Sequence, residues 1–149
     1  MNIKEYRKML KSKDKKTRQK AVDNLALSQD EEATEALITI LEHDPEGSVR
    51  RRAALALGRI GCEVALESLC QVMKNDPDEE TRKNAAISVG KFGDFRAIPV
   101  LFDFYSAPRQ NNFFDNIDRA RVNLVLTELA QTKGFKTIEE LVEWYESEH

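Results

Sequence analysis

The sequence repeats itself with a period of 32 residues, seen in the step from Thr17 to Val49 to Thr81. The same phase relates Leu25, Leu57 and Val89, then Ala33, Ala65 and Ala97, then Leu37, Leu69 and Leu101. A fixed period of roughly 20 to 50 residues is typical of stacked arrays, in which each unit buries its apolar face against its neighbours. The chain is therefore predicted to be a short solenoid.

Each unit has the pattern of two helices. In the second unit, apolar residues at positions 53, 54, 57 and 60, and then at 65, 69, 72 and 73, follow the spacing of one helix face. Gly61 and Gly93 separate the paired helices, since glycine adopts the left-handed C-cap conformation at low cost. Asp-Pro steps at 44–45 and 76–77 end the second helices, because proline cannot extend a helix. These signals predict an all-α fold of stacked antiparallel helix pairs.

The helix signals divide the chain as a single repeat domain, residues 1–149. We predict an N-terminal capping helix at 2–12, helix pairs at about 16–43, 48–75 and 79–106, and a divergent C-terminal pair at about 115–148. Two capping boxes support this division. Ser28 with Glu31 fits the start of a second helix, and Thr137 with Glu140 fits the start of the last helix.

The clearest family signal lies in the first helix of the second unit. It is the segment Val49-Arg50-Arg51-Arg52-Ala53-Ala54-Leu55-Ala56-Leu57-Gly58-Arg59-Ile60-Gly61, and residues 81–93 are a second copy. The segment resembles the HEAT repeats of the phycobilisome-lyase-like group, and the resemblance covers roughly residues 12–105. It implies a HEAT-like, right-handed α-solenoid.

The same resemblance implies a structural ladder, in which a turn aspartate and a first-helix arginine form hydrogen bonds between repeats. The residues in these positions are Asp44 with Arg50 and Asp76 with Arg82. The sequence departs from the family pattern at both ends, since Ser12 stands one period before Asp44 and Pro108 one period after Asp76. We therefore expect the ladder to cover only the middle of the array.

Few residues of this chain are suited to catalysis or metal binding. Its two histidines, His43 and His149, and its two cysteines show none of the paired spacings of metal ligands, and no glycine-rich phosphate loop is present. The lone serine and cysteine residues have no histidine base nearby in the pattern. We expect no catalytic residue, no metal and no cofactor, and hence that the chain is not an enzyme.

Composition favours a helical chain outside the membrane. Hydrophobic residues make up 41% and charged residues 33%, with only six glycines and four prolines. No apolar run approaches the roughly 20 residues that cross a bilayer, and the N-terminal segment lacks the apolar core of a signal peptide. We expect a cytoplasmic protein without membrane contact.

We predict that the chain is a protein-binding scaffold or adaptor. The resemblance implies that the second helices of the pairs line the concave surface, and the 32-residue phase identifies their outward side chains. These are Glu35, Thr39, Glu42, Glu67, Gln71, Lys74 and Asp103. Acidic groups prevail in this row, which favours a basic partner protein. Phe113 and Phe114, in an Asn-rich insertion, are further partner-binding candidates, with a tucked cap as the alternative.

Two alternative functions remain open. Residues 1–20 carry nine Lys/Arg against two Asp/Glu, a balance of +7 in a chain of net charge −3, which suits nucleic-acid binding. A second basic cluster comprises Arg50–Arg52 and Arg59, of which Arg50 is assigned to the ladder and the other three are interpreted as a solvated face. The other alternative, a lyase-like auxiliary subunit, comes from the resemblance alone. A protein partner is preferred to nucleic acid because the chain is acidic overall.

Overall fold

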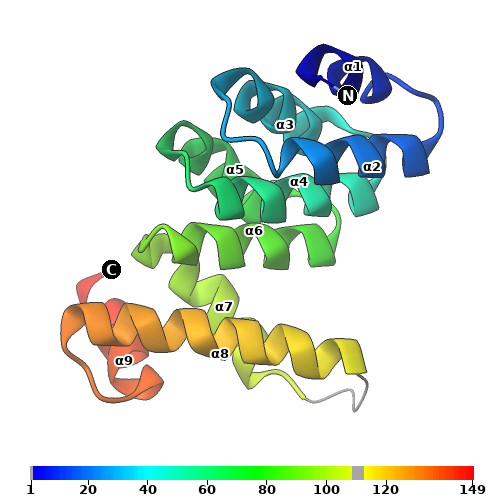
Figure 1. Ribbon diagram of the computed structural model, residues 1–149. Coiled ribbons are helices and arrows are strands. Elements are labelled where there is room, and N and C mark those ends of the chain that lie inside the picture. The colour runs from blue at the N-terminus through cyan, green and yellow to red at the C-terminus, as the bar shows by residue number, and fades with distance from the viewer. Residues whose placement is uncertain (1, 109–112) are drawn as a thin grey trace.

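The computed structural model describes residues 2–108 and 113–149, with the side chains of residues 113 and 114 excepted. This part of the chain forms helices and turns, and it contains no strand. The helices are α1 (Ile3–Met9), α2 (Lys15–Leu25), α3 (Glu31–His43), α4 (Gly47–Ile60), α5 (Leu66–Asn75), α6 (Glu79–Lys91), α7 (Ile98–Ser106), α8 (Phe113–Lys133) and α9 (Ile138–Glu148). Short 3₁₀ turns, η1 (Glu63–Ala65) and η2 (Phe95–Ala97), precede α5 and α7. The predicted all-α fold of stacked helix pairs is confirmed (Figure 1).

The helices begin and end where local chemistry favours it. The side chains of Asp14, Asp30 and Asp78 accept hydrogen bonds from backbone N–H groups in the first turns of α2, α3 and α6. Gly61 and Gly93, just after α4 and α6, have φ angles of 71° and 77°, a conformation that side-chain-bearing residues rarely adopt. Glycine therefore defines the turn inside the two central pairs.

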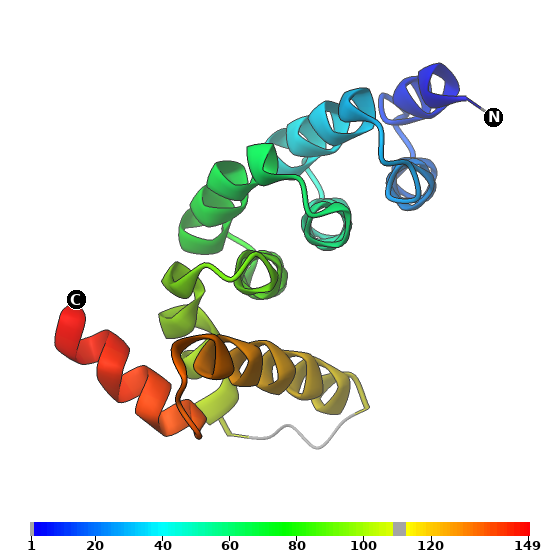
Figure 2. The same cartoon turned by 60° about the vertical axis from the view of Figure 1, so that its left-hand side comes forward.

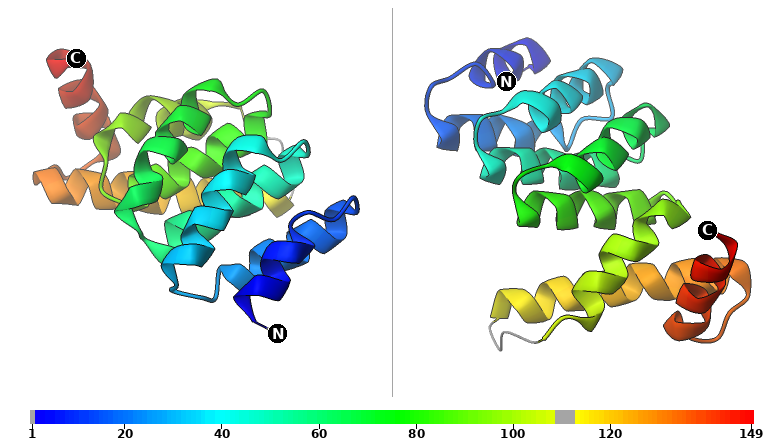
Figure 3. Two further views of the ribbon diagram at one scale, coloured as in Figure 1. Left: turned by 90° about the horizontal axis from the view of Figure 1, so that it is seen from above. Right: turned by 180° about the vertical axis from the view of Figure 1, so that it is seen from behind.

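The pairs stack side by side into an arc, with α1 at one end and α9 at the other (Figures 1 and 3). Figure 2 shows α2, α4 and α6 end-on along the inner side of the arc, with α3 and α5 along its outer side. The first helix of each of these pairs therefore belongs to the concave layer. The expectation that the second helices line the concave surface is wrong.

The small residues between the first helices explain this curvature. Four alanines are fully buried in this region: Ala53, Ala54, Ala85 and Ala86. A Cβ atom on Gly58 would lie only 2.6 Å from the Cβ atom of Ser88, so α4 and α6 approach almost backbone to backbone. The Ser88 hydroxyl also donates to the carbonyl oxygen of Ala54 at 2.7 Å. Helices that meet through small side chains lie closer together than helices that meet through leucine, and the closer row takes the inner side of a curved stack.

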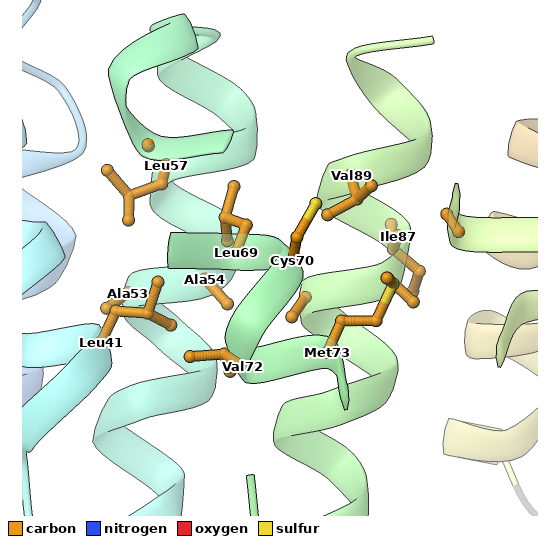
Figure 4. Packing of buried hydrophobic residues seen from close by; sticks show 14 of the residues in the cluster. Leu41, Ala53, Ala54, Leu57, Leu69, Cys70, Val72, Met73, Ile87 and Val89 are labelled. Carbon is orange, nitrogen blue, oxygen red and sulfur yellow. The ribbon is translucent and has the colours of Figure 1, made fainter. Parts of the chain in front are cut away.

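Larger apolar side chains of the second helices fill the space behind this row. Leu69, Val72 and Met73 of α5 lie against α4 and α6, as Figure 4 shows. All three belong to one apolar cluster that runs through the stack from Leu10 to Val142. Every pair thus depends on its neighbours for burial, as expected of a solenoid.

Aromatic packing closes the C-terminal end. The Trp144 ring of α9 meets the Phe95 ring edge-on, with 5.4 Å between centroids, and the centroid of Phe135 lies 6.0 Å away. The ammonium group of Lys133 lies 4.4 Å from the centroid of the Trp144 ring. These contacts join α9 to the end of α8 and to the turn before α7.

None of the described helices combines the length and the apolar character needed to cross a membrane.

The contact between α4 and α6 can be tested by adding one methyl group. We expect Gly58→Ala to lower the free energy of unfolding by about 1–2 kcal/mol, although alanine is the better helix former by about 1 kcal/mol, because the new Cβ atom meets Ser88. Urea denaturation of the single and double variants measures this. Ser88→Gly should cost less stability in the Gly58→Ala background than in the wild type, and equal costs in both backgrounds would contradict the contact.

Candidate functional site

A groove of about 840 Å³ lies on the concave side of the arc. Its lining comes mainly from the first helices α2, α4 and α6 and from the N-terminal half of α8, with Phe104 contributed by α7. Figure 2 looks into the arc along α4 and α6, with α8 turned across its lower end. Apolar groups such as Leu55 and Phe104 alternate in the lining with charged side chains of both signs.

Lys83 forms the lower end of the groove and ties three helices together. Its ammonium group lies 2.7 Å from a carboxylate oxygen of Glu80 and 2.7 Å from one of Asp118 on α8. It also lies 4.4 Å from the centroid of the Phe104 ring, a cation–π contact. Lys83 is only 6% exposed, so burial strengthens these contacts and they hold α8 in place against α6.

Two further ion pairs lie along the groove, one between α4 and α2 and one within α8. Arg52 of α4 donates to the carboxylate of Asp23 on α2 at 2.6 Å. Arg121 of α8 lies 4.0 Å from the carboxylate of Asp118. Both arginines are about half exposed, so each pair contributes little stability by itself and leaves its guanidinium group accessible from the groove.

One stripe of α4 differs from the rest of the lining. Arg51, Leu55 and Arg59 lie four residues apart along α4, which places them on the same helix face, and all three line the groove. Within the described part of the chain, neither arginine makes a hydrogen bond or an ion pair through its side chain. Leu55 lies between them and is partly exposed. This stripe offers an apolar contact flanked by two available cations.

Arginines of the first helices also tie successive turns together. The guanidinium group of Arg50 donates to the two carboxylate oxygens of Asp76 at 2.8 and 3.1 Å, and to the carbonyl oxygen of Asp44 at 2.8 Å. Arg18 donates in the same way to the carboxylate of Asp44, at 2.7 and 3.1 Å, and to the carbonyl oxygen of Ser12 at 2.9 Å. The hydrogen bond to Asp76 raises the pKa of Arg50, which therefore stays charged. Each arginine thus joins the turn before its own helix to the following turn. The expectation that the ladder covers only the middle is wrong at the N-terminal end, because Arg18 binds the carbonyl oxygen of Ser12 and needs no aspartate side chain there.

The ladder changes at its C-terminal end. Arg82 donates to the carbonyl oxygen of Asp76 at 2.6 Å, but Pro108 stands where the next aspartate would be. Arg119 of α8 serves this region instead. It donates to backbone carbonyl oxygens at the end of α7, at 2.8 and 3.0 Å, and pairs with Asp115 one turn earlier in α8 at 2.9 Å.

The family model for HEAT repeats matches residues 3–79 and, a second time, residues 34–111. This chain belongs to the HEAT-repeat family. The resemblance read from residues 49–61 and 81–93 is therefore confirmed. No curated protein matches the sequence significantly.

A solved structure shares the HEAT-repeat fold. It is the complex of CpcE and CpcF of phycocyanin lyase from Nostoc sp. PCC7120, with a TM-score of 0.66 and 23% sequence identity. The match covers 89% of this chain and 55% of that chain, so this chain spans about half the length of the neighbour. The likeness shows a common fold.

The predicted partner-binding row lies away from the groove of this HEAT array. All seven residues are exposed, on α3 (Glu35, Thr39 and Glu42), α5 (Glu67, Gln71 and Lys74) and α7 (Asp103). Its residues on α3 and α5 belong to the convex side of the arc, because these two helices run along the outer side (Figure 2). The placement of this row on the concave face is therefore corrected. Phe113 and Phe114 begin α8, but their side chains lie outside the described residues.

The residues that shape the groove were missing from the sequence-based site. Leu55, Lys83, Phe104 and Asp118 were not singled out, and the interpretation of Arg51 and Arg59 as a solvated face overlooked the groove beside them. The 32-residue period could have identified part of this groove. Position 83 is one period after position 51, so a cation lines the groove at the same place in two successive first helices.

The ladder predicts unequal effects for two equivalent arginines. Arg50→Ala should lower the free energy of unfolding by about 3 kcal/mol, because it leaves the buried carboxylate of Asp76 without its arginine. Arg82→Ala removes one hydrogen bond to a carbonyl group and should cost about 1 kcal/mol. Urea denaturation compares the two variants. Similar losses for both would show that the carboxylate pairing does not stabilise the stack.

Proposed function

We propose that this HEAT-repeat chain is a scaffold whose concave groove binds another protein. The proposal rests on the stripe of Arg51, Leu55 and Arg59, where two available cations flank a partly exposed apolar side chain inside a groove. Apolar contact combined with charge-assisted hydrogen bonds is typical of protein interfaces, which are also enriched in arginine. The structural neighbour supports a protein partner, since that structure is itself a complex of two proteins.

The groove is held in shape by contacts within the chain. Lys83 joins α6 to α7 and α8, Arg52 joins α4 to α2, and Arg50 links the turns at one end of α4 and α5. A preformed surface loses little conformational entropy on binding, so more of the contact energy appears as affinity. In this proposal the chain recognises its partner without a catalytic step and without a cofactor.

The proposal can be tested by placing a charge at the centre of the stripe. Leu55→Glu should abolish capture of the partner by the tagged chain, because it replaces the apolar contact with a carboxylate between two arginines. The variant Glu35→Lys/Glu67→Lys/Asp103→Lys, altered on the second helices outside the groove lining, should retain capture. Quantitative affinity purification with mass spectrometry from the source cells measures both, after circular dichroism has shown that each variant keeps its helicity and melting temperature.

The opposite pattern would move the site. Loss of the partner with the triple variant, and retention with Leu55→Glu, would place binding on the second helices. Loss only on deletion of Phe113 and Phe114 would place it at the insertion.

A second candidate function has its own observation. Seven lysines of α1, α2 and the turn between them are exposed, and none of their ammonium groups makes an ion pair within the described residues. They are Lys4, Lys8, Lys11, Lys13, Lys15, Lys16 and Lys20. Such a surface attracts phosphate backbones without reading a base sequence.

The lysine surface can be tested with duplex DNA at physiological salt. If the lysines form only a solvated face, binding should be weak and independent of sequence. Fluorescence anisotropy measures the affinity, with Lys8→Gln/Lys15→Gln/Lys16→Gln as the matched variant. Submicromolar binding that is lost in this variant would favour nucleic-acid binding as the function.

Two further expectations stay predictions. A lyase-like auxiliary role rests on the fold shared with the phycocyanin lyase complex alone. A cytoplasmic location rests on the sequence composition.

A further inference from the structure

We propose that the occupant of the concave groove is an acidic amphipathic helix of the partner protein. Two of its carboxylates pair with Arg51 and Arg59, and an apolar side chain between them covers Leu55. This inference rests on the proposed function, because it names the chemistry of the partner at the same groove.

The first step of the argument is the charge that remains available in the groove. Its carboxylates are largely engaged inside the chain: Asp23 with Arg52, Glu80 with Lys83, and Asp118 with Lys83 and Arg121. Asp115 pairs with Arg119, which stands just behind the lining. An incoming chain therefore meets carboxylates that are already neutralised.

Two arginines of α4 are in the opposite situation. Arg51 and Arg59 make no hydrogen bond or ion pair through their side chains within the described part of the chain, although both line the groove. Glu79 is the one lining carboxylate with no such contact among the described residues, and it lies in the first turn of α6, where the helix dipole offsets its charge. The charge left for a partner is positive, so the groove is complementary to an acidic segment.

The spacing of the stripe favours a helical occupant. Arg51 and Arg59 are eight residues apart on α4, which corresponds to about 12 Å at a rise of 1.5 Å per residue. A partner helix that lies along α4 and carries carboxylates at positions i and i+8 spans the same distance on one face, with position i+4 opposite Leu55.

The backbone of the groove wall points to the same conclusion. The wall consists of the sides of helices, whose N–H and C=O groups are hydrogen-bonded within each helix, so it offers no sheet edge to pair with. An extended peptide could pair its backbone here only with side chains and water, whereas a helix satisfies its backbone internally.

The proposed contacts also predict which partners are excluded. A basic helix would place like charges beside Arg51 and Arg59 as the groove loses water, which weakens binding. The exposed row on the convex side, with Glu35 and Glu67, has the opposite preference. The two faces of the arc thus differ in the charge that they present to a partner.

A peptide display selection tests the inference directly. The probe is a library of alanine-rich helical peptides of about 16 residues, randomised at positions i, i+4 and i+8 and selected on the immobilised full chain. The expected result is enrichment of Asp or Glu at i and i+8 with a large apolar residue at i+4. Enriched peptides should fail to bind Leu55→Glu.

The affinity of the most enriched peptide then tests the two arginines. Arg51→Gln/Arg59→Gln should weaken binding about tenfold and reduce its dependence on salt, since two charge pairs are lost. The control Lys74→Gln/Lys136→Gln removes the same net charge from exposed positions outside the groove and should change the affinity less than about twofold.

The outcomes separate this inference from the proposed function. Enrichment of basic or uncharged peptides that still lose binding with Leu55→Glu overturns the acidic partner but supports a protein-binding groove. Acidic peptides that bind Arg51→Gln/Arg59→Gln as tightly as the wild type also overturn the inference. A selection that enriches no peptide dependent on Leu55 counts against both proposals.

Discussion

The close approach of the first helices is the constraint on which the rest of the structure depends. Gly58 faces Ser88 with no room for a Cβ atom, and the alanines beside them keep α4 and α6 close along their length. The second helices, which pack through leucine, valine and methionine, stay further apart. A stack with one short and one long row must curve toward the short row. The small size of the side chains between α4 and α6 therefore determines the direction of curvature. It also determines which helices form the concave layer and line the groove.

The arginine ladder supplies a constraint in the other direction, along the turns. Curvature by itself would leave the turns at one edge of the stack free to splay, with their carbonyl groups unsatisfied. Arg18 and Arg50 each bind a carbonyl group of the turn before their own helix and the carboxylate of the following turn. The turns are thereby held at a fixed spacing. Where the aspartate is replaced by Pro108, α8 departs from the parallel row and brings its own arginine, Arg119.

Much of this fold could be predicted because its signals are local. The glycines after α4 and α6 and the cap of α9 by Thr137 depend on residues only a few positions apart, and the 32-residue period is read directly from the sequence. The capping box predicted at Ser28 was wrong, because Asp30 caps α3 instead and the helix begins at Glu31. Both residues suit the role, and local sequence does not decide between them.

The concave face could not be predicted in the same way. Periodicity shows which side chains of a helix are buried, but the inner layer is decided by the relative spacing of two rows of helices. That spacing depends on contacts between residues about 30 positions apart, such as Gly58 with Ser88. The partner of each ladder arginine is also difficult to predict from local sequence. An arginine and the aspartate six positions earlier share a turn, whereas the carboxylate that the arginine binds lies 26 positions later, in the next repeat.

The chemistry of the groove arises where the array stops being regular. Arg51 and Lys83 occupy the same place in successive repeats, yet their surroundings differ. Lys83 is buried because α8 crosses the end of the row and supplies Asp118, while α7 supplies Phe104. Arg51 has no crossing helix above it, so its charge stays available next to Leu55. At the end of the array, α8 supplies a carboxylate that pairs with Lys83. In the middle of the array, no described helix supplies a carboxylate that pairs with Arg51. A helix from a partner would provide the same kind of contact one repeat earlier.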